Sequence, residues 1–206
     1  MYNFDFHLAT NIHFGRGSVT SSLVKELGHG KNVFFVYDEV PVKASRLYDE
    51  IISALKAAGV RYQEFTGVEP NPRHTTVNRG IAALKEFNAD CIVAAGGGST
   101  LDCAKAISFG VYHDGDVWDF YSGRVPVEKV MPVIAIPTLA ASGAEVSFSA
   151  VISNKMCIRD SLGDNRFIIS LDIFDLVQTV FDPVLGQITI GNLPHLPLSA
   201  CVKRVS

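Results

Sequence analysis

The fold is decided by residues 90 to 105, Asp90-Cys-Ile-Val-Ala-Ala-Gly-Gly-Gly-Ser-Thr-Leu-Asp-Cys-Ala-Lys105. The uncharged, non-alternating start, Cys91 to Ala95, is typical of a strand buried on both faces of a parallel sheet. Three glycines follow, and Ser99 and Asp102 then form a Ser-x-x-Asp pattern that predicts a helix start with a capping box. The stretch therefore predicts a strand, a glycine turn and a helix N-terminus in succession.

The glycine turn, Gly96, Gly97 and Gly98, is suited to binding a phosphate. Without Cβ atoms a ligand can approach the backbone closely, and the amides and dipole of the helix N-terminus favour an anion. A tight turn without a ligand is the alternative that this stretch alone leaves open. Lys105, further along the same helix, is predicted to face a phosphate or an acid, with a solvated lysine as an equal alternative.

Similar patterns recur on both sides of this stretch and define the fold class. Strands alternate with helices from residue 32 to residue 109, which predicts an α/β domain with a mainly parallel, Rossmann-like sheet and flanking helices. The flanking sequence is less regular: a short edge strand or hairpin is expected near the start, and a loop or short helix with packed aromatics before the last strand. The expected strands are 32–37, 60–65 and 133–136, with the short strand or hairpin within 1–15, and the expected helices are 18–27, 47–58 and 76–87.

Two further stretches are candidates for ligand contact. Asp38 directly follows the strand 32–37, where a carboxylate can accept hydrogen bonds from ribose hydroxyls and repel a 2′-phosphate. Ligands of parallel sheets bind outside the carboxyl ends of the strands, so one ligand can touch Asp38 and the glycine turn together. Residues 139–147 are small and rich in hydroxyl groups, so a ligand can lie against their backbone, although a plain loop is the favoured reading.

Composition excludes several classes of protein. A hydrophobic content of 48% indicates a globular chain, and a formal net charge of −3 gives no electrostatic case for nucleic acid. No apolar run approaches the ~20 residues of a membrane span, and no signal peptide is visible. Four scattered cysteines without a Cys-x-x-Cys pair favour reduced thiols in a cytoplasmic protein. His7 and His13 are expected to be surface or core residues rather than metal ligands.

Five segments together resemble the iron-containing (group III) alcohol dehydrogenase family, most closely its butanol dehydrogenase branch. They occur in the family's order and spacing, and the resemblance covers residues 1–154. The segments are Phe14-Gly-Arg-Gly17, Gly67-Val-Glu-Pro-Asn-Pro72, Gly96-Gly-Gly-Ser-Thr-Leu-Asp-Cys-Ala-Lys105, Val117-Trp-Asp-Phe-Tyr-Ser-Gly123 and Ile136-Pro-Thr-Leu-Ala-Ala-Ser-Gly-Ala-Glu145. Trp118, in the fourth segment, is expected to pack rather than to bind.

The resemblance implies an NAD(P)-dependent enzyme that transfers hydride between the cofactor and a primary alcohol or aldehyde such as butanol. It also implies which residues contact the cofactor. Gly97, Gly98 and Ser99, with Gly96 in the same turn, would hold the pyrophosphate, and Asp102 would shape the site. Thr138 and Leu139 would lie along the cofactor, and Ser142 would face its nicotinamide end.

Asp38 matches the family position that favours NAD over NADP. The NADP-dependent butanol dehydrogenases carry a glycine-rich turn where this chain has Asp38-Glu-Val-Pro41. The resemblance therefore implies NAD as the cofactor, with NADP as the weaker candidate. The partner is a small alcohol or aldehyde, and a homodimer stays open.

The family's divalent metal, Fe or Zn, is held by one aspartate and three histidines of an all-helical C-terminal domain. This chain has one histidine after residue 113, His195, so that domain is expected to be largely absent and the chain to lack activity. Residues 155–206 are expected to be a non-family tail, an assembly or frameshift artefact, because residues 155–161 resemble translated sequencing-adapter sequence.

Two alternatives to this function stay open. One is a relative of glycerol dehydrogenase or dehydroquinate synthase, which share the glycine turn and a metal, although residues 137–145 favour the alcohol dehydrogenases. The other is a non-catalytic nucleotide-binding module.

Overall fold

The computed structural model describes residues 10–28, 30–147 and 149–154, together with three strands beyond them, of which it describes the backbone. Six parallel strands form the main sheet in the order β1-β8-β5-β4-β2-β3. They are β1 (Ile12–Phe14), β2 (Asn32–Tyr37), β3 (Arg61–Phe65), β4 (Cys91–Gly96), β5 (Val133–Pro137) and β8 (Val177–Phe181). The predicted Rossmann-like α/β fold is confirmed.

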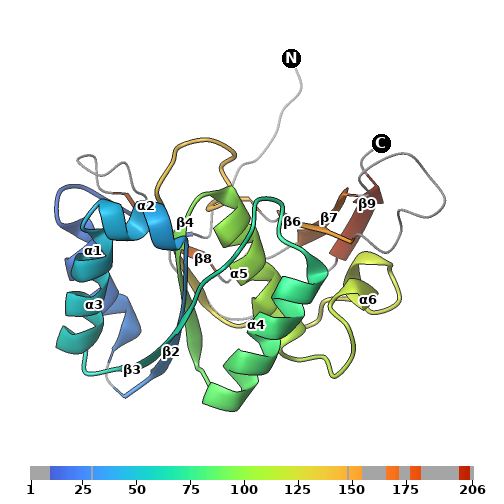
Figure 1. Ribbon diagram of the computed structural model, residues 1–206, viewed down its shortest axis with the longest axis horizontal. Helices are drawn as coiled ribbons and strands as arrows, with labels where there is room; N and C mark the ends of the chain where they lie inside the picture. Colours follow the sequence, from blue (N-terminus) through green and yellow to red (C-terminus); the bar gives the residue numbers. More distant parts are fainter. Residues whose placement is uncertain are drawn as a thin grey trace, which may run out of the picture.

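Helices cover both faces of this sheet (Figure 1). On one face lie α1 (Ser18–Leu27), α2 (Glu39–Ala44) and α3 (Leu47–Ala57). On the other lie α4 (His74–Phe87), α5 (Gly98–Gly110) and the short α6 (Trp118–Tyr121). A second, antiparallel sheet joins β6 (Ser149–Ser153), β7 (Arg166–Leu171) and β9 (Ala200–Arg204) in the order β6-β7-β9.

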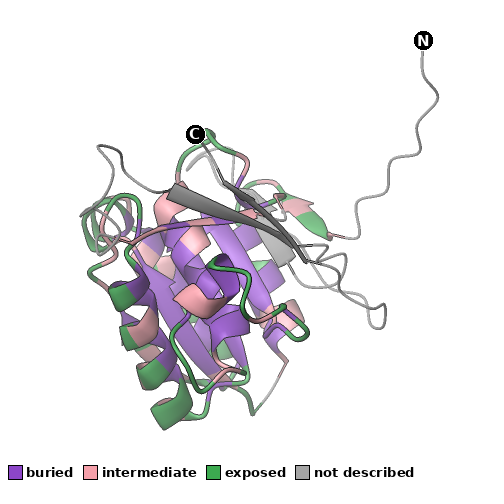
Figure 2. Ribbon diagram, turned by 90° about the vertical axis from the view of Figure 1, so that its right-hand side faces the viewer, coloured by how far each residue is buried: buried purple, intermediate pink, exposed green. Residues whose placement is uncertain are grey.

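The central strands have continuous apolar sequences because both of their faces are buried. Along β2, Val33 and Phe35 pack with α1 and α3, whereas Phe34 and Val36 pack with α4 and α5. Figure 2 shows the result, with buried residues on the sheet and on the inner sides of the helices. An alternating strand would have exposed one face to solvent.

The predicted boundaries hold to within two residues for most elements. The expected helices at 18–27, 47–58 and 76–87 correspond to α1, α3 and α4, and the expected strand at 133–136 corresponds to β5. Of the expected N-terminal strand or hairpin, β1 is found, and residues 1–9 lie outside the described part. The sequence did not predict α2, whose run contains Pro41, or β6.

Helices α4 and α5 pack closely through two glycines. A Cβ on Gly80 of α4 would clash with Ile107 Cδ1, and a Cβ on Gly110 of α5 would clash with Ile81 Cδ1. Each helix therefore places an isoleucine against a glycine of the other. These two reciprocal contacts hold α5 against α4. They therefore also hold the start of α5, where the glycine turn lies.

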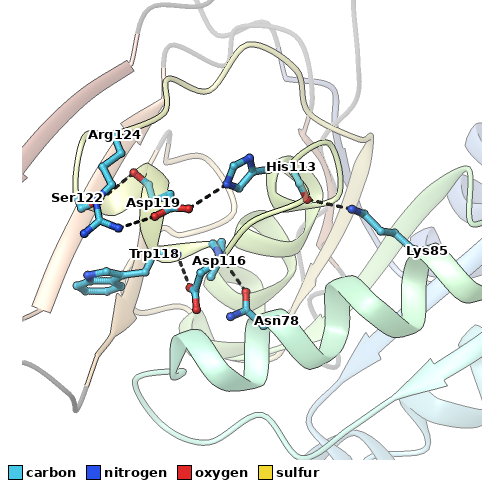
Figure 3. Close-up of polar contacts among 9 residues, drawn as sticks. Asn78, Lys85, His113, Asp116, Trp118, Asp119, Ser122 and Arg124 are labelled. Carbon is cyan, nitrogen blue, oxygen red and sulfur yellow. Dashed lines mark hydrogen bonds and ion pairs between the residues drawn. The ribbon is translucent and has the colours of Figure 1, made fainter.

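The segment after α5 is held by a set of polar contacts (Figure 3). Asp119 accepts hydrogen bonds from His113 and Arg124 at 3.1 and 2.9 Å, and these two groups lower the pKa of its carboxyl. Asn78 of α4 accepts the Val117 amide at 3.0 Å. The expected packing role of Trp118 is confirmed, since its ring stacks on Tyr121 with centroids 5.6 Å apart.

The structure describes the side chains of two cysteines and of His13. Cys91 and Cys103 are free and buried, and burial raises the pKa of Cys91 to about 11, so its thiol stays protonated. His13 lies 3.1 Å from Glu26 of α1, which links β1 to that helix. His7 lies outside the described residues. Within the described part, no helix combines the length and hydropathy that crossing a bilayer requires.

Candidate cofactor-binding site

Three strands end side by side at one edge of the main sheet. Tyr37 of β2 is in register with Ala95 of β4, and Gly96 is in register with Pro137 of β5. Beyond the strands, the Asp38 amide donates to the Ala95 carbonyl at 3.0 Å, and the Thr138 amide donates to the Gly96 carbonyl at 3.0 Å. The structure therefore brings Asp38 and the glycine turn together, as the sequence predicted, with Thr138 beside them.

Helix α5 begins two residues earlier than the sequence predicted, within the glycine turn. Gly97 is the N-cap in an extended conformation, φ −76° and ψ −178°, and no side chain caps the helix. The predicted Ser99–Asp102 capping box is therefore wrong, because both residues already lie inside α5. Gly97, Gly98 and Ser99 are half-buried, so the helix N-terminus is reached by solvent.

Ser99 is held by Asn71, which was not among the predicted site residues. Its Oγ accepts the Asn71 amide at 3.2 Å, and Asn71 has a left-handed φ of 53°. Asparagine tolerates this conformation better than most residues. The signal was present in the sequence, since Pro-Asn-Pro follows the end of β3 and hence belongs to the same sheet edge.

Asp102 and Lys105 form a buried ion pair one turn into α5. Their charged atoms are 3.3 Å apart, and the side chains are 15% and 3% exposed. Of the alternatives for Lys105, an acid partner is confirmed and a solvated lysine is wrong. Asp102 also accepts the Val151 amide, so its carboxylate joins α5 to β6.

The segment from Thr138 to Ser147 lies over the start of α5. Leu139 is 65% exposed, and Ser142 is exposed too. A Cβ on Gly98 would lie 2.7 Å from Ser142 Oγ, so the absence of a side chain at this glycine lets Ser142 approach the helix. Ser142 thus lies beside the glycine turn, and Leu139 of the same segment faces solvent.

The backbone at Gly97 supplies a cradle for a ligand. A Cβ built on Gly97 meets nothing within 4 Å, although its φ permits any side chain. Backbone amides at an uncapped helix N-terminus beside open space fit a diphosphate. A metal does not fit the described part of the chain, which contains no group of three or more His, Cys, Asp or Glu residues able to hold one.

A parallel sheet with helices on both faces and a glycine turn after an interior strand defines the class of Rossmann-like α/β domains. Comparison with known families narrows this class. The chain belongs to the iron-containing alcohol dehydrogenase family, whose model matches residues 9–175.

Individual relatives agree with this assignment. A probable NADH-dependent butanol dehydrogenase of Bacillus subtilis is 45% identical over 155 residues, and NADH-dependent butanol dehydrogenase A of Clostridium acetobutylicum is 41% identical over 154. Each match covers 75% of this chain and 40% of the relative. The chain thus spans less than half the length of these curated relatives.

A solved structure confirms the fold over the same part. The NADH-dependent butanol dehydrogenase A of Thermotoga maritima superposes with a TM-score of 0.71 at 34% identity. The superposition covers 76% of this chain and 40% of that one. The NADPH-dependent aldehyde reductase YqhD of Escherichia coli, 32% identical over 187 residues, shows that relatives use either dinucleotide.

Proposed function

We propose that this chain is the NAD(H)-binding part of an oxidoreductase acting on primary alcohols and aldehydes. The observation that carries the proposal is the open backbone at Gly97, at the uncapped start of α5, in a member of the iron-containing alcohol dehydrogenase family. The names of the relatives in Bacillus and Clostridium support NADH and butanol as starting points for assays.

Each residue of the site has a role in this proposal. The amides of Gly97, Gly98 and Ser99 bind the diphosphate, with Gly96 ending the strand that presents them. Asp38 accepts the adenosine ribose hydroxyls.

The far half of the site is assigned to the segment after β5. Thr138 and Leu139 lie along the cofactor, and Ser142 lies toward its nicotinamide end. Asp102 shapes the site from within α5. The bound dinucleotide supplies the hydride, and these residues hold and orient it.

Cofactor choice tests the role of Asp38. NADH is expected to bind the chain at least about tenfold more tightly than NADPH, because the Asp38 carboxylate repels a 2′-phosphate. In Asp38→Asn this preference should fall to within about threefold, since the amide carries no charge. Isothermal titration with both cofactors measures the two dissociation constants.

Asp49→Asn is the matched control, because it removes the same charge from the exposed surface of α3. Equal affinities of the unsubstituted chain for NADH and NADPH would contradict the role of Asp38. No binding of either dinucleotide would contradict the proposed function itself.

We further propose that the 206-residue chain alone does not catalyse the reduction of an aldehyde by NADH. With NADH, butyraldehyde and added Fe²⁺ or Zn²⁺, loss of absorbance at the NADH band is expected to stay at the rate without protein. The reason is the lack of a ligand set for the metal among the described residues. NADH oxidation that depends on both protein and metal would show that the chain is catalytically complete.

A further inference from the structure

The segment 138–147 covers the start of α5 but has little regular structure of its own. Residues 139–142 are exposed, while Ala144 and Glu145 are buried. Its backbone is tied to the main sheet at one end, where the Thr138 amide donates to the Gly96 carbonyl. The contacts at its other end, residues 144–147, therefore determine how firmly the exposed residues 139–142 are held.

Those contacts come from Lys105. Its Nζ donates to the carbonyl of Ala144 at 2.9 Å and of Ser147 at 3.4 Å, and also to the carbonyl of Ser149. An ammonium carries three donors, and its acceptors here are these three main-chain oxygens of one short stretch and the Asp102 carboxylate at 3.3 Å. A single side chain of α5 thus fastens the end of the segment and the start of β6.

The surroundings explain how a lysine tolerates this position. Lys105 is 2% exposed, and burial lowers its pKa, while the nearby carboxylates of Asp102 and Glu145 favour the charged form. A buried ammonium is tolerated only when it is paired and its donors are used. The carbonyls and the two acids supply that compensation.

Because Lys105 is enclosed, it cannot itself touch a ligand at the turn. We propose that Lys105 is a positioning residue that holds segment 138–147 over the glycine turn and thereby keeps Leu139 and Ser142 in place for the cofactor. The inference rests on the proposed function, since it assigns to this segment a role in NADH binding. The fastening itself is a property of the protein without ligand.

Hydrogen exchange of the free protein tests the fastening. In Lys105→Met, amides within 138–147 are expected to exchange at least about tenfold faster than in the unsubstituted chain, while those of β2 and β4 keep their rates. Lys105→Gln should give an intermediate rate, because its amide can still donate to one carbonyl. If the methionine variant lacks the native circular dichroism, the glutamine variant decides the comparison.

Lys85→Met is the matched control. Lys85 likewise donates to a main-chain carbonyl, that of His113 at 2.9 Å (Figure 3). It also pairs with an aspartate, Asp114 at 3.0 Å. This substitution should leave exchange in 138–147 unchanged. Equal exchange rates in Lys105→Met and the unsubstituted chain would overturn the inference.

The second measurement is the dissociation constant for NADH, which should rise at least about fivefold in Lys105→Met and stay unchanged in Lys85→Met. Faster exchange with an unchanged NADH affinity would show that the fastening has no role in binding and would also overturn the inference. If the unsubstituted chain does not bind NADH, the proposed function fails, while the exchange comparison still decides whether Lys105 fastens the segment.

Discussion

A Gly97→Val substitution is expected to raise the dissociation constant for NADH at least about a hundredfold, or about 2.7 kcal/mol, while the free energy of unfolding falls by less than about 1 kcal/mol because an N-cap prefers glycine to valine. Valine suits the extended backbone of Gly97, φ −76° and ψ −178°, and a Cβ there meets no atom of the protein within 4 Å. Its methyl groups would fill the space that the diphosphate needs. Titration calorimetry with NADH and urea unfolding measure the two effects.

Ala82→Val places a valine side chain on the exposed surface of α4 and should leave NADH binding unchanged. Tight NADH binding by Gly97→Val would show that the cofactor does not bind at the glycine turn. A large loss of stability would instead mean that the open side of Gly97 is needed by the protein.

Gly80→Val is expected to destabilise the fold by about 1–3 kcal/mol, because the contact between α4 and α5 has no room for a side chain. A Cβ at this glycine would clash with Ile107 Cδ1 and lie 3.0 Å from Ile107 Cγ1 and 3.3 Å from Phe65 Cζ. Chemical denaturation of the variant and the unsubstituted chain gives the difference.

The double variant Gly80→Val/Ile107→Ala separates the clash from the lower helix propensity of valine. Removing the isoleucine relieves the clash, so the two changes together should cost at least about 1 kcal/mol less than their sum. If the two losses in unfolding free energy simply add, the clash is not the cause, and α4 can shift away from α5 to make room for the valine.

The central part of the fold is predictable because its energetics are local in the sequence. β2 and β4 are buried on both faces, so their apolar runs mark them without knowledge of their neighbours. Helix α2 was missed because it lies in a run with Pro41, which is tolerated here in the first turn. Strand β6 was missed because its pairing partner, β7, begins more than ten residues later in the chain.

The candidate site was predictable where it depends on strand ends and less so where it depends on tertiary contacts. Asp38 and the glycine turn each follow a recognisable strand, so their meeting follows from the topology. Most partners of Lys105 could not be predicted, because three of them are main-chain carbonyls about 40 residues further along the chain. The Ser99–Asp102 pattern misled, since an extended glycine ahead of it already starts the helix.

The order of the strands explains why Asp38 and the glycine turn meet at this edge of the sheet. After β2 the chain moves outward to β3 through α2 and α3 on one face, and after β4 it moves the opposite way to β5 through α5 on the other face. The two connections leave β2 and β4 in opposite directions, so neither crosses the carboxyl ends of these strands. The location of the proposed site thus follows from the path of the chain, and in this proposal the side chains at the strand ends decide which dinucleotide binds.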